Sequence, residues 1–262
     1  MKEFYFISGL PRSGSTLLST ILKQNPEFYA DIHTPMDLFI DRTLHIIDNS
    51  ESKNVINKEH RKNILNGIFD GYYKHVDKPV IFDTSRTWTK KVDLLKCLFP
   101  YTKIICTVRD VVSILNSFEV LERKNCLTAR DIDDNVFFRC QKYMEEYEGV
   151  ISKALVSLEQ GLSSNPSLIK LIEYEDLCKN PEKVLREIYS FLNKPYYNHS
   201  FKNLEYSNKK FDMKTTLDGL HTIKSEVIYN PPKCILPESI IEEYKDMEFW
   251  RRNNNKTAFS YS

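Results

Sequence analysis

The residues most able to do chemistry lie near the start of the chain, in the segment Ser8-Gly9-Leu10-Pro11-Arg12-Ser13-Gly14-Ser15-Thr16. Four residues separate Gly9 from Gly14, which is the spacing of the phosphate-binding loop of nucleotide hydrolases. Glycines let a backbone wrap around an anion, and the open amides of a following helix point at it. The segment therefore predicts an anion site between a strand and a helix.

One position departs from the nucleotide-hydrolase pattern. Ser15 stands where those enzymes have a lysine that reaches the β- and γ-phosphates, and Arg12 is the only cation in the loop. Asp83 is the nearest acid that could hold magnesium, and we interpret it more readily as a capping residue. Metal-independent transfer of a less charged group fits this loop better than ordinary phosphoryl transfer.

A second segment, Lys103–Ser117, has the pattern of a strand, an arginine at its carboxyl end and a helix. Arg109 and Ser117 are eight residues apart, which is about 12 Å along a helix. A charge-assisted hydrogen bond from Arg109 to an anion contributes roughly 1.5–3 kcal/mol. Two interpretations remain open from these residues alone: an anion site, or an arginine that pairs with a surface carboxylate.

Three motifs together carry a resemblance to a known family. Pro11–Leu17 resembles the phosphosulfate loop of sulfotransferases, closest in style to the bacterial and tyrosylprotein-type members. Tyr174–Leu177 is similar to a later segment of that family, and the motifs follow the family order over residues 4–192. The resemblance implies in-line transfer of a sulfuryl group from 3'-phosphoadenylyl sulfate (PAPS) to a hydroxyl, which leaves adenosine 3',5'-bisphosphate (PAP).

The resemblance also implies roles for residues of the donor site. The loop would hold the phosphosulfate, Arg109 and Ser117 the 3'-phosphate, and Tyr174 would approach the adenine, although a core tyrosine is an equal alternative for Tyr174. Lys224 is a weaker candidate on a later segment, as are Lys209 and Lys210. The expected donor-binding residues are Pro11, Arg12, Ser13, Gly14, Ser15, Thr16, Arg109, Ser117, Tyr174 and Lys224.

Two catalytic residues are expected, Arg12 and His33. Arg12 would stabilise charge on the leaving phosphate. His33 stands where tyrosylprotein-type enzymes have a glutamate, and a histidine with an unperturbed pKa near 6.5 is chemically competent as a base. The alternative is a loop histidine without a role, with Asp31 and Asp37 as the fallback bases.

The segment Asp83–Trp88 departs from the family a second time. Many relatives have a lysine where Thr84 falls in this chain. Either Arg86 supplies that charge from two residues along, or the enzyme relies on Arg12 alone. Trp88 is either a wall of the acceptor pocket or a core residue.

The elements that position these residues follow from the alternation of apolar strands with helical patterns, which predicts an α/β fold: a P-loop-like parallel sheet flanked by helices. A single domain over residues 1–262 is expected, and residues 198–236 form a loop-rich C-terminal arm that is a candidate lid. The expected strands are Glu3–Ser8, Pro79–Asp83, Lys103–Val108 and Ser167–Glu173. The expected helices are Gly14–Lys23, Pro35–Asp48, Glu59–His75, Thr89–Leu98, Val111–Glu122, Ile132–Glu159, Pro181–Leu192 with Asn180 as its N-cap, and Pro237–Trp250.

Composition narrows the function classes. A net charge of +1 favours neither nucleic acid nor a membrane surface as a partner, so an anion site must be built locally. The six cysteines form no CxxC pair, which argues against zinc and favours a reducing, cytoplasmic setting. No apolar run reaches about 18 residues, so no membrane anchor is expected.

Two other functions compete with sulfuryl transfer. One is a magnesium-dependent kinase of a small metabolite, which the absent lysine disfavours. The other is a nucleotide-binding relic without chemistry, which the changes at positions 33 and 84 favour. The acceptor stays open between a small molecule, a carbohydrate and a peptidyl tyrosine. We expect its pocket to come from His33–Asp48, Asn125–Asn135 and the arm beyond Asn198.

Overall fold

The computed structural model describes residues 2–49, 51–126, 135–146, 148–204, 219–221 and 223–252. A five-stranded parallel sheet with the order β2-β3-β1-β4-β5 lies at its centre. The strands are β1 (Glu3–Gly9), β2 (Phe28–Ala30), β3 (Val80–Thr84), β4 (Ile104–Val108) and β5 (Ile169–Glu173). The expected α/β fold is confirmed, and four strands lie where the sequence predicts them. The sequence missed β2, because three residues are too few to show a periodic pattern.

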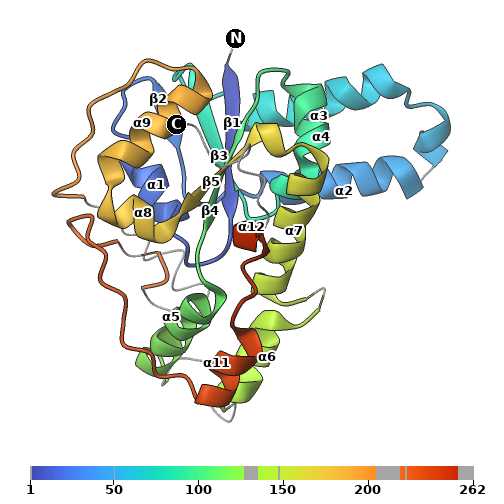
Figure 1. Ribbon diagram of the computed structural model, residues 1–262. Helices are drawn as coiled ribbons and strands as arrows, with labels where there is room; N and C mark the ends of the chain where they lie inside the picture. The colour runs from blue at the N-terminus through green and yellow to red at the C-terminus, as the bar shows by residue number, and fades with distance from the viewer. Residues whose placement is uncertain are drawn as a thin grey trace.

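Helices cover both faces of the sheet, because its strands are apolar on both sides. In β1, Phe4 and Phe6 belong to one buried cluster, and Tyr5 and Ile7 belong to the other. Figure 1 shows one group of helices on one side of the sheet and a second group on the other. The first group is α1 (Ser15–Leu22), α8 (Tyr174–Lys179) and α9 (Pro181–Leu192); the second is α3 (Lys58–Tyr72), α4 (Val92–Leu98) and α7 (Val150–Ser164).

Two expected helices are each broken in two. The helix expected over Ile132–Glu159 begins outside the described residues and continues as α6 (Val136–Met144) and α7. The chain turns at Gly149, where a Cβ atom would lie 2.5 Å from the carbonyl oxygen of Tyr143. The helix expected over Pro237–Trp250 becomes α11 (Glu238–Tyr244) and α12 (Phe249–Arg252), because Asp246 between them has a left-handed φ of 61°.

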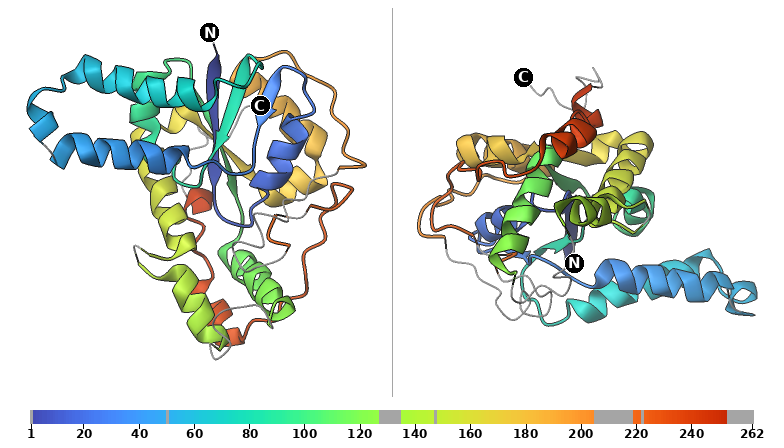
Figure 2. Two further views of the ribbon diagram at one scale, coloured as in Figure 1. Left: turned by 180° about the vertical axis from the view of Figure 1, so that it is seen from behind. Right: turned by 90° about the horizontal axis from the view of Figure 1, so that it is seen from below.

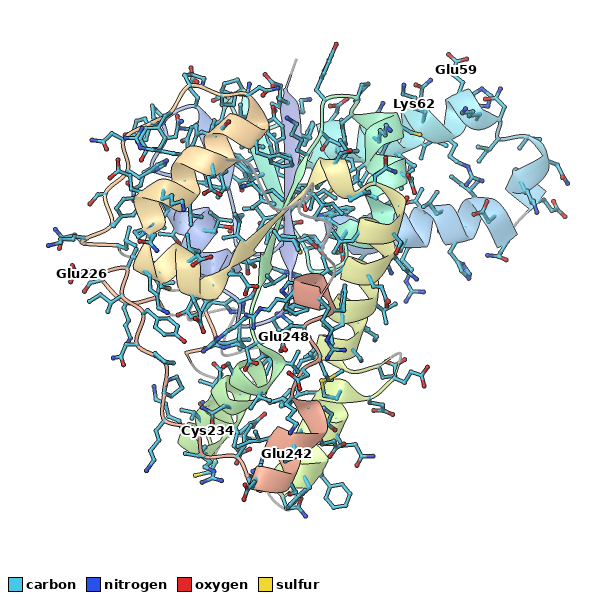
Figure 3. All side chains as sticks on the ribbon, in the orientation of Figure 1. Glu59, Lys62, Glu226, Cys234, Glu242 and Glu248 are labelled. Carbon is cyan, nitrogen blue, oxygen red and sulfur yellow. The ribbon has the colours of Figure 1, made fainter. Side chains whose placement is uncertain are left out.

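One further helix frames the site. α5 (Val111–Lys124) follows β4, and its N-cap Asp110 accepts a hydrogen bond from the amide of Ser113. α9 begins at Pro181 as expected, but the side chain of Asn180 makes no capping hydrogen bond. The remaining helix, α2 (Met36–Asn49), pairs with α3 in a hairpin that projects from the body in both views of Figure 2. Glu59 and Lys62 lie at its outer edge, far from the centre of the molecule (Figure 3).

The loop-rich arm is confirmed in its described parts, residues 198–204, 219–221 and 223–236, which contain no helix and only one isolated β-bridge. Backbone hydrogen bonds hold the arm together: the amide of Leu204 donates to Ser225 at 2.8 Å, and that of Val227 donates to Phe201 at 2.9 Å. Lys209 and Lys210 lie outside the described residues. Within the described part of the chain, no helix is both long and apolar enough to cross a membrane.

Candidate active site

The loop between β1 and α1 depends on its two glycines. Gly9 has a φ of 126°, and a Cβ atom there would lie 2.0 Å from the carbonyl oxygen of Thr107 on β4. Gly14 is the N-cap of α1, with a φ of 94° and no side chain to occupy the first amides of the helix. No acidic residue lies in that first turn. The amides at the start of α1 are therefore available to an anion.

Ser13 shapes this loop from beneath. Its side chain is fully buried, and its hydroxyl lies 2.7 Å from the hydroxyl of Thr107 and 2.5 Å from the carbonyl oxygen of Leu10. Ser13 is the one expected donor-binding residue that does not line the cavity described below. Its hydroxyl therefore holds the loop in shape, and only its backbone amide is left for an anion.

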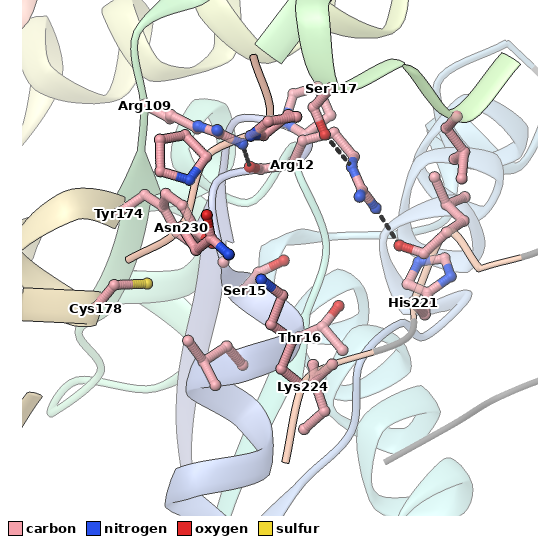
Figure 4. Close-up of a pocket in the computed structure, with 18 of the residues that line it drawn as sticks. Arg12, Ser15, Thr16, Arg109, Ser117, Tyr174, Cys178, His221, Lys224 and Asn230 are labelled. Carbon is pink, nitrogen blue, oxygen red and sulfur yellow. Dashed lines mark hydrogen bonds between the residues drawn. The ribbon is translucent and has the colours of Figure 1, made fainter. Parts of the chain in front are cut away.

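The first two motifs of the sequence meet at Arg12. This residue has a left-handed φ of 58°, and its Nε donates a hydrogen bond of 3.1 Å to the hydroxyl of Ser117. A second nitrogen of Arg12 donates to the carbonyl oxygen of Leu220, which lies on the arm. Arg109 donates in turn to the carbonyl oxygen of Arg12, at 3.1 Å. The loop, α5 and the arm are thus joined around one arginine (Figure 4).

The third motif adds Tyr174. The guanidinium of Arg109 lies 4.6 Å from the centroid of the Tyr174 ring, a cation–π contact. The same ring packs against the loop, since a Cβ atom on Gly14 would lie 2.8 Å from its Cδ2. Burial raises the pKa of Tyr174 to about 12, so its hydroxyl keeps its proton at neutral pH. All three predicted motifs therefore surround one space.

That space is a cavity of about 320 Å³ at the carboxyl ends of the strands, where ligands of open α/β sheets bind. Among the described residues that line it, Glu226 is the one acid. The cations stand out in a chain whose net charge is only +1. They are Arg12, Arg86, Arg109, Lys124 and Lys224. The expected donor-binding residues on its wall are Pro11, Arg12, Gly14, Ser15, Thr16, Arg109, Ser117, Tyr174 and Lys224.

Lys124 and His221 also line the cavity, and neither was predicted from the sequence. Ser117, Leu121 and Lys124 line the cavity from positions i, i+4 and i+7 of α5. This helical spacing could have revealed Lys124 once Ser117 was placed on a helix. His221 carries no such signal, because only the path of the arm brings it to the wall.

His33 lies beside this cavity and does not line it. Desolvation lowers its pKa below the usual 6.5, and so do the positive charges of Arg86 and His221. The carboxylates of Asp37 and Asp31 oppose that shift. The amide of the next residue, Thr34, donates to the carbonyl oxygen of Thr84 at 3.2 Å, which sets His33 near the Arg86 side of the cavity. The lowered pKa favours the neutral ring, which is the form that can accept a proton.

The structure corrects the expectation for Asp83 and settles the one for Trp88. Asp83 caps no helix: it is completely buried and accepts hydrogen bonds from the hydroxyls of Thr34 and Tyr73 and from the indole of Trp88. Burial raises the pKa of Asp83 to about 6. Trp88 is fully buried in the core, as the second interpretation held. Within the described residues, no cluster of three or more acidic, histidine or cysteine side chains could hold a metal.

Comparison with known proteins matches residues 5–198 to the sulfotransferase family. Protein-tyrosine sulfotransferase A of Caenorhabditis elegans is 26% identical over 204 residues, which are 74% of this chain and 50% of that protein. The protein-tyrosine sulfotransferase of Drosophila melanogaster is 26% identical over 215 residues, 78% of this chain and 40% of that protein. The chain thus spans half or less of the length of these curated relatives.

Solved structures share the fold. The sulfotransferase domain of the Synechococcus PCC 7002 olefin synthase gives a TM-score of 0.52 at 18% identity, covering 92% of each chain. Retinol dehydratase in complex with androsterone and the inactive cofactor PAP gives 0.51 at 15% identity, covering 99% of this chain and 82% of that one. With three quarters of its length matched by the family and its predicted motifs gathered around one cavity, the chain belongs to the sulfotransferase family.

Proposed function

We propose that the protein transfers a sulfuryl group from PAPS to a hydroxyl. The observation that carries the proposal is the cationic cavity, which joins the start of α1 to Arg109 and Ser117. PAPS has two separate anionic groups, and the cavity offers them the open amides at the start of α1 and the side chains of Arg109 and Ser117. Support comes from the relatives named as tyrosine sulfotransferases and from the fold neighbour that binds PAP.

The chain's own residues divide the task. The first amides of α1, with Ser15 and Thr16, hold the phosphosulfate. Arg109 and Ser117 bind the 3'-phosphate, Tyr174 lies along the adenine, and Lys224 adds charge from the arm. His33 removes the proton of the acceptor hydroxyl as the new S–O bond forms. Arg12 stabilises the charge on the phosphate oxygen as the old S–O bond breaks and PAP departs.

The proposed arrangement disfavours the two competing functions. A kinase of this type needs a lysine in the loop and a magnesium ion, and Ser15 stands in the lysine position. A nucleotide-binding protein without catalytic activity does not require a histidine of lowered pKa beside the cavity. The acceptor is proposed only as a hydroxyl compound, and the reducing setting inferred from the cysteines stays a prediction.

Two measurements test the proposal. We expect calorimetry without magnesium to show PAP binding at micromolar or lower dissociation constants, and ATP with magnesium to bind at least tenfold more weakly. We expect label from [³⁵S]PAPS to appear on one of three acceptors: a tyrosine peptide, 2-naphthol or a steroid alcohol. Tight ATP binding that depends on magnesium would support the kinase instead, and PAP binding without transfer to any hydroxyl class would support the relic.

A further inference from the structure

Arg86 differs from the other two arginines that line the cavity. Arg12 and Arg109 both donate hydrogen bonds to protein groups. Among the described residues, the guanidinium of Arg86 makes no hydrogen bond or ion pair, although it lines the same wall as Ser15 and Thr16. A guanidinium has five N–H donors in a fixed fork that matches an anionic group. Arg86 therefore presents an uncommitted cation to whatever occupies the cavity.

The backbone of Arg86 is held against the start of the phosphate-binding loop. Its carbonyl oxygen accepts a hydrogen bond of 3.0 Å from the hydroxyl of Ser8, the last residue before Gly9. The amide of the preceding Ser85 donates to the carbonyl oxygen of Ile7 at 3.1 Å. Two adjacent residues of the turn are thus bonded to the end of β1, which places Arg86 beside the loop.

Asp37 fixes the same turn from the other side. One oxygen of its carboxylate accepts from the hydroxyl of Ser85 at 2.6 Å and from that of Thr87 at 2.8 Å, the two residues that flank Arg86. Its other oxygen accepts from the amide of Leu38 at 2.8 Å. Both oxygens of the Asp37 carboxylate already accept hydrogen bonds, so Asp37 is a poor candidate for the base. Its contacts instead fix the position of residues 85–87.

Thr84 cannot supply a charge at the position where many relatives have lysine. Its side chain is buried and is not part of the cavity wall. On the basis of the proposed function, we propose that Arg86 binds the sulfuryl group of the donor, and that Asp37 is the positioning residue that holds Arg86 there. Arg12 then stabilises the charge on the leaving phosphate, and Arg86 stabilises the charge on the sulfuryl group as it is transferred.

The test uses the difference between the two nucleotides, since PAPS has the sulfuryl group and PAP lacks it. We expect Arg86→Met to weaken PAPS binding roughly tenfold to a hundredfold in calorimetry, as for one lost charge-assisted hydrogen bond. PAP affinity should change less than about twofold, which also shows that the variant is folded. Arg86→Lys should lie between the two, and Lys90→Met, an exposed cation outside the cavity wall, should match the wild type.

Asp37 is tested through coupling. Asp37→Ala should weaken PAPS more than PAP, and adding it to Arg86→Met should bring little further loss, because both changes remove the same contact. Asp37→Asn keeps an oxygen for the two hydroxyls and should recover most of the PAPS affinity.

The possible failures are distinguishable. If wild-type protein binds neither nucleotide, the proposed function itself is wrong. If the wild type binds both and Arg86→Met leaves the PAPS-to-PAP affinity ratio unchanged, the role of Arg86 is wrong while the proposed function stands. An additive effect of the two substitutions would overturn the positioning role of Asp37 alone.

Discussion

The two sides of the cavity are built in different ways. On the donor side, the loop of residues 9–16 takes its shape mainly from its own residues, two glycines with positive φ and an inward serine at the start of α1, with Thr107 as its distant contact. On the His33 side, residues 31–37 and 84–88 are held by contacts between distant parts of the chain, around the carboxylates of Asp37 and Asp83. Changes on the donor side should therefore alter the affinity for PAP. Changes on the other side should leave PAP affinity nearly unchanged and should alter turnover or, at Arg86 and Asp37, the binding of the sulfuryl group of PAPS.

The largest effect is expected at His33. Loss of a positioned base costs about 10²–10⁴ in rate, so His33→Ala should lower kcat by that factor and leave the PAP dissociation constant unchanged. Steady-state kinetics and calorimetry measure the two quantities, with His45→Ala on the exposed face of α2 as the control. If His33→Ala weakened PAP binding and left kcat unchanged, the proposed difference between the two sides of the cavity would be wrong.

The pH profile sharpens the same assignment. A base works in its neutral form, and the pKa of His33 lies below its usual 6.5. The acid limb of wild-type kcat should therefore have its midpoint below pH 6.5. Because Arg86 and His221 lower this pKa while Asp37 and Asp31 raise it, Arg86→Met should move the acid limb toward 6.5. An acid limb already present above pH 6.5 in the wild type would contradict the role of His33.

Arg12 comes next and belongs to both sides, since it contacts the donor loop, Ser117 and the arm. Removing one preorganised donor at a developing charge costs about 10²–10³ in kcat. Arg12→Ala should show that loss in turnover together with weaker PAP binding, while Lys23→Ala, an exposed residue just after α1, should behave as the wild type. Retained turnover would remove Arg12 from the reaction.

Substitution of Arg109 should change nucleotide affinity alone and leave kcat unchanged. A lost hydrogen bond to a charged group costs about 1.5–3 kcal/mol, or roughly 10- to 150-fold in affinity. Arg109→Ala should raise the PAP dissociation constant by that factor and abolish the preference for PAP over adenosine 5'-monophosphate, with kcat retained at saturating PAPS. Lys153→Ala, an exposed residue of α7, is the matched control. Preserved discrimination would place the 3'-phosphate elsewhere.

The last prediction concerns stability on the His33 side, where no change in nucleotide affinity is measured. The folded pKa of Asp83 is raised to about 6 from 3.8, so its protonated form favours the native state. That contribution is fully present below pH 3.8 and is lost as the pH rises to about 6. In urea unfolding, the wild type should therefore lose stability relative to Asp83→Asn between pH 4.5 and 7.5. Equal pH dependence of both proteins would mean that Asp83 does not titrate in this range.

Local sequence patterns were enough to predict most of the fold and most of the donor-binding residues. Short apolar runs predicted four strands, because a buried parallel strand needs apolar residues on both faces. The glycine spacing and the strand–arginine–helix pattern marked Arg12 and Arg109 as candidate anion-binding residues, and the structure brings the two together at one cavity. The pattern failed where a break lies within continuous apolar spacing, as at Gly149 and Asp246.

The sequence by itself determined the anion-binding loop, the order of the motifs and the family resemblance, because these depend on residues close together in the chain. Tertiary structure alone decided what surrounds His33, why Asp83 is buried, and that Arg86 reaches the cavity while Thr84 does not. These features depend on contacts among the end of β1, the residues that follow β3 and the start of α2, at sequence separations that no local spacing encodes. For the same reason, Asp37 looks like a spare base in the sequence and like a brace in the fold.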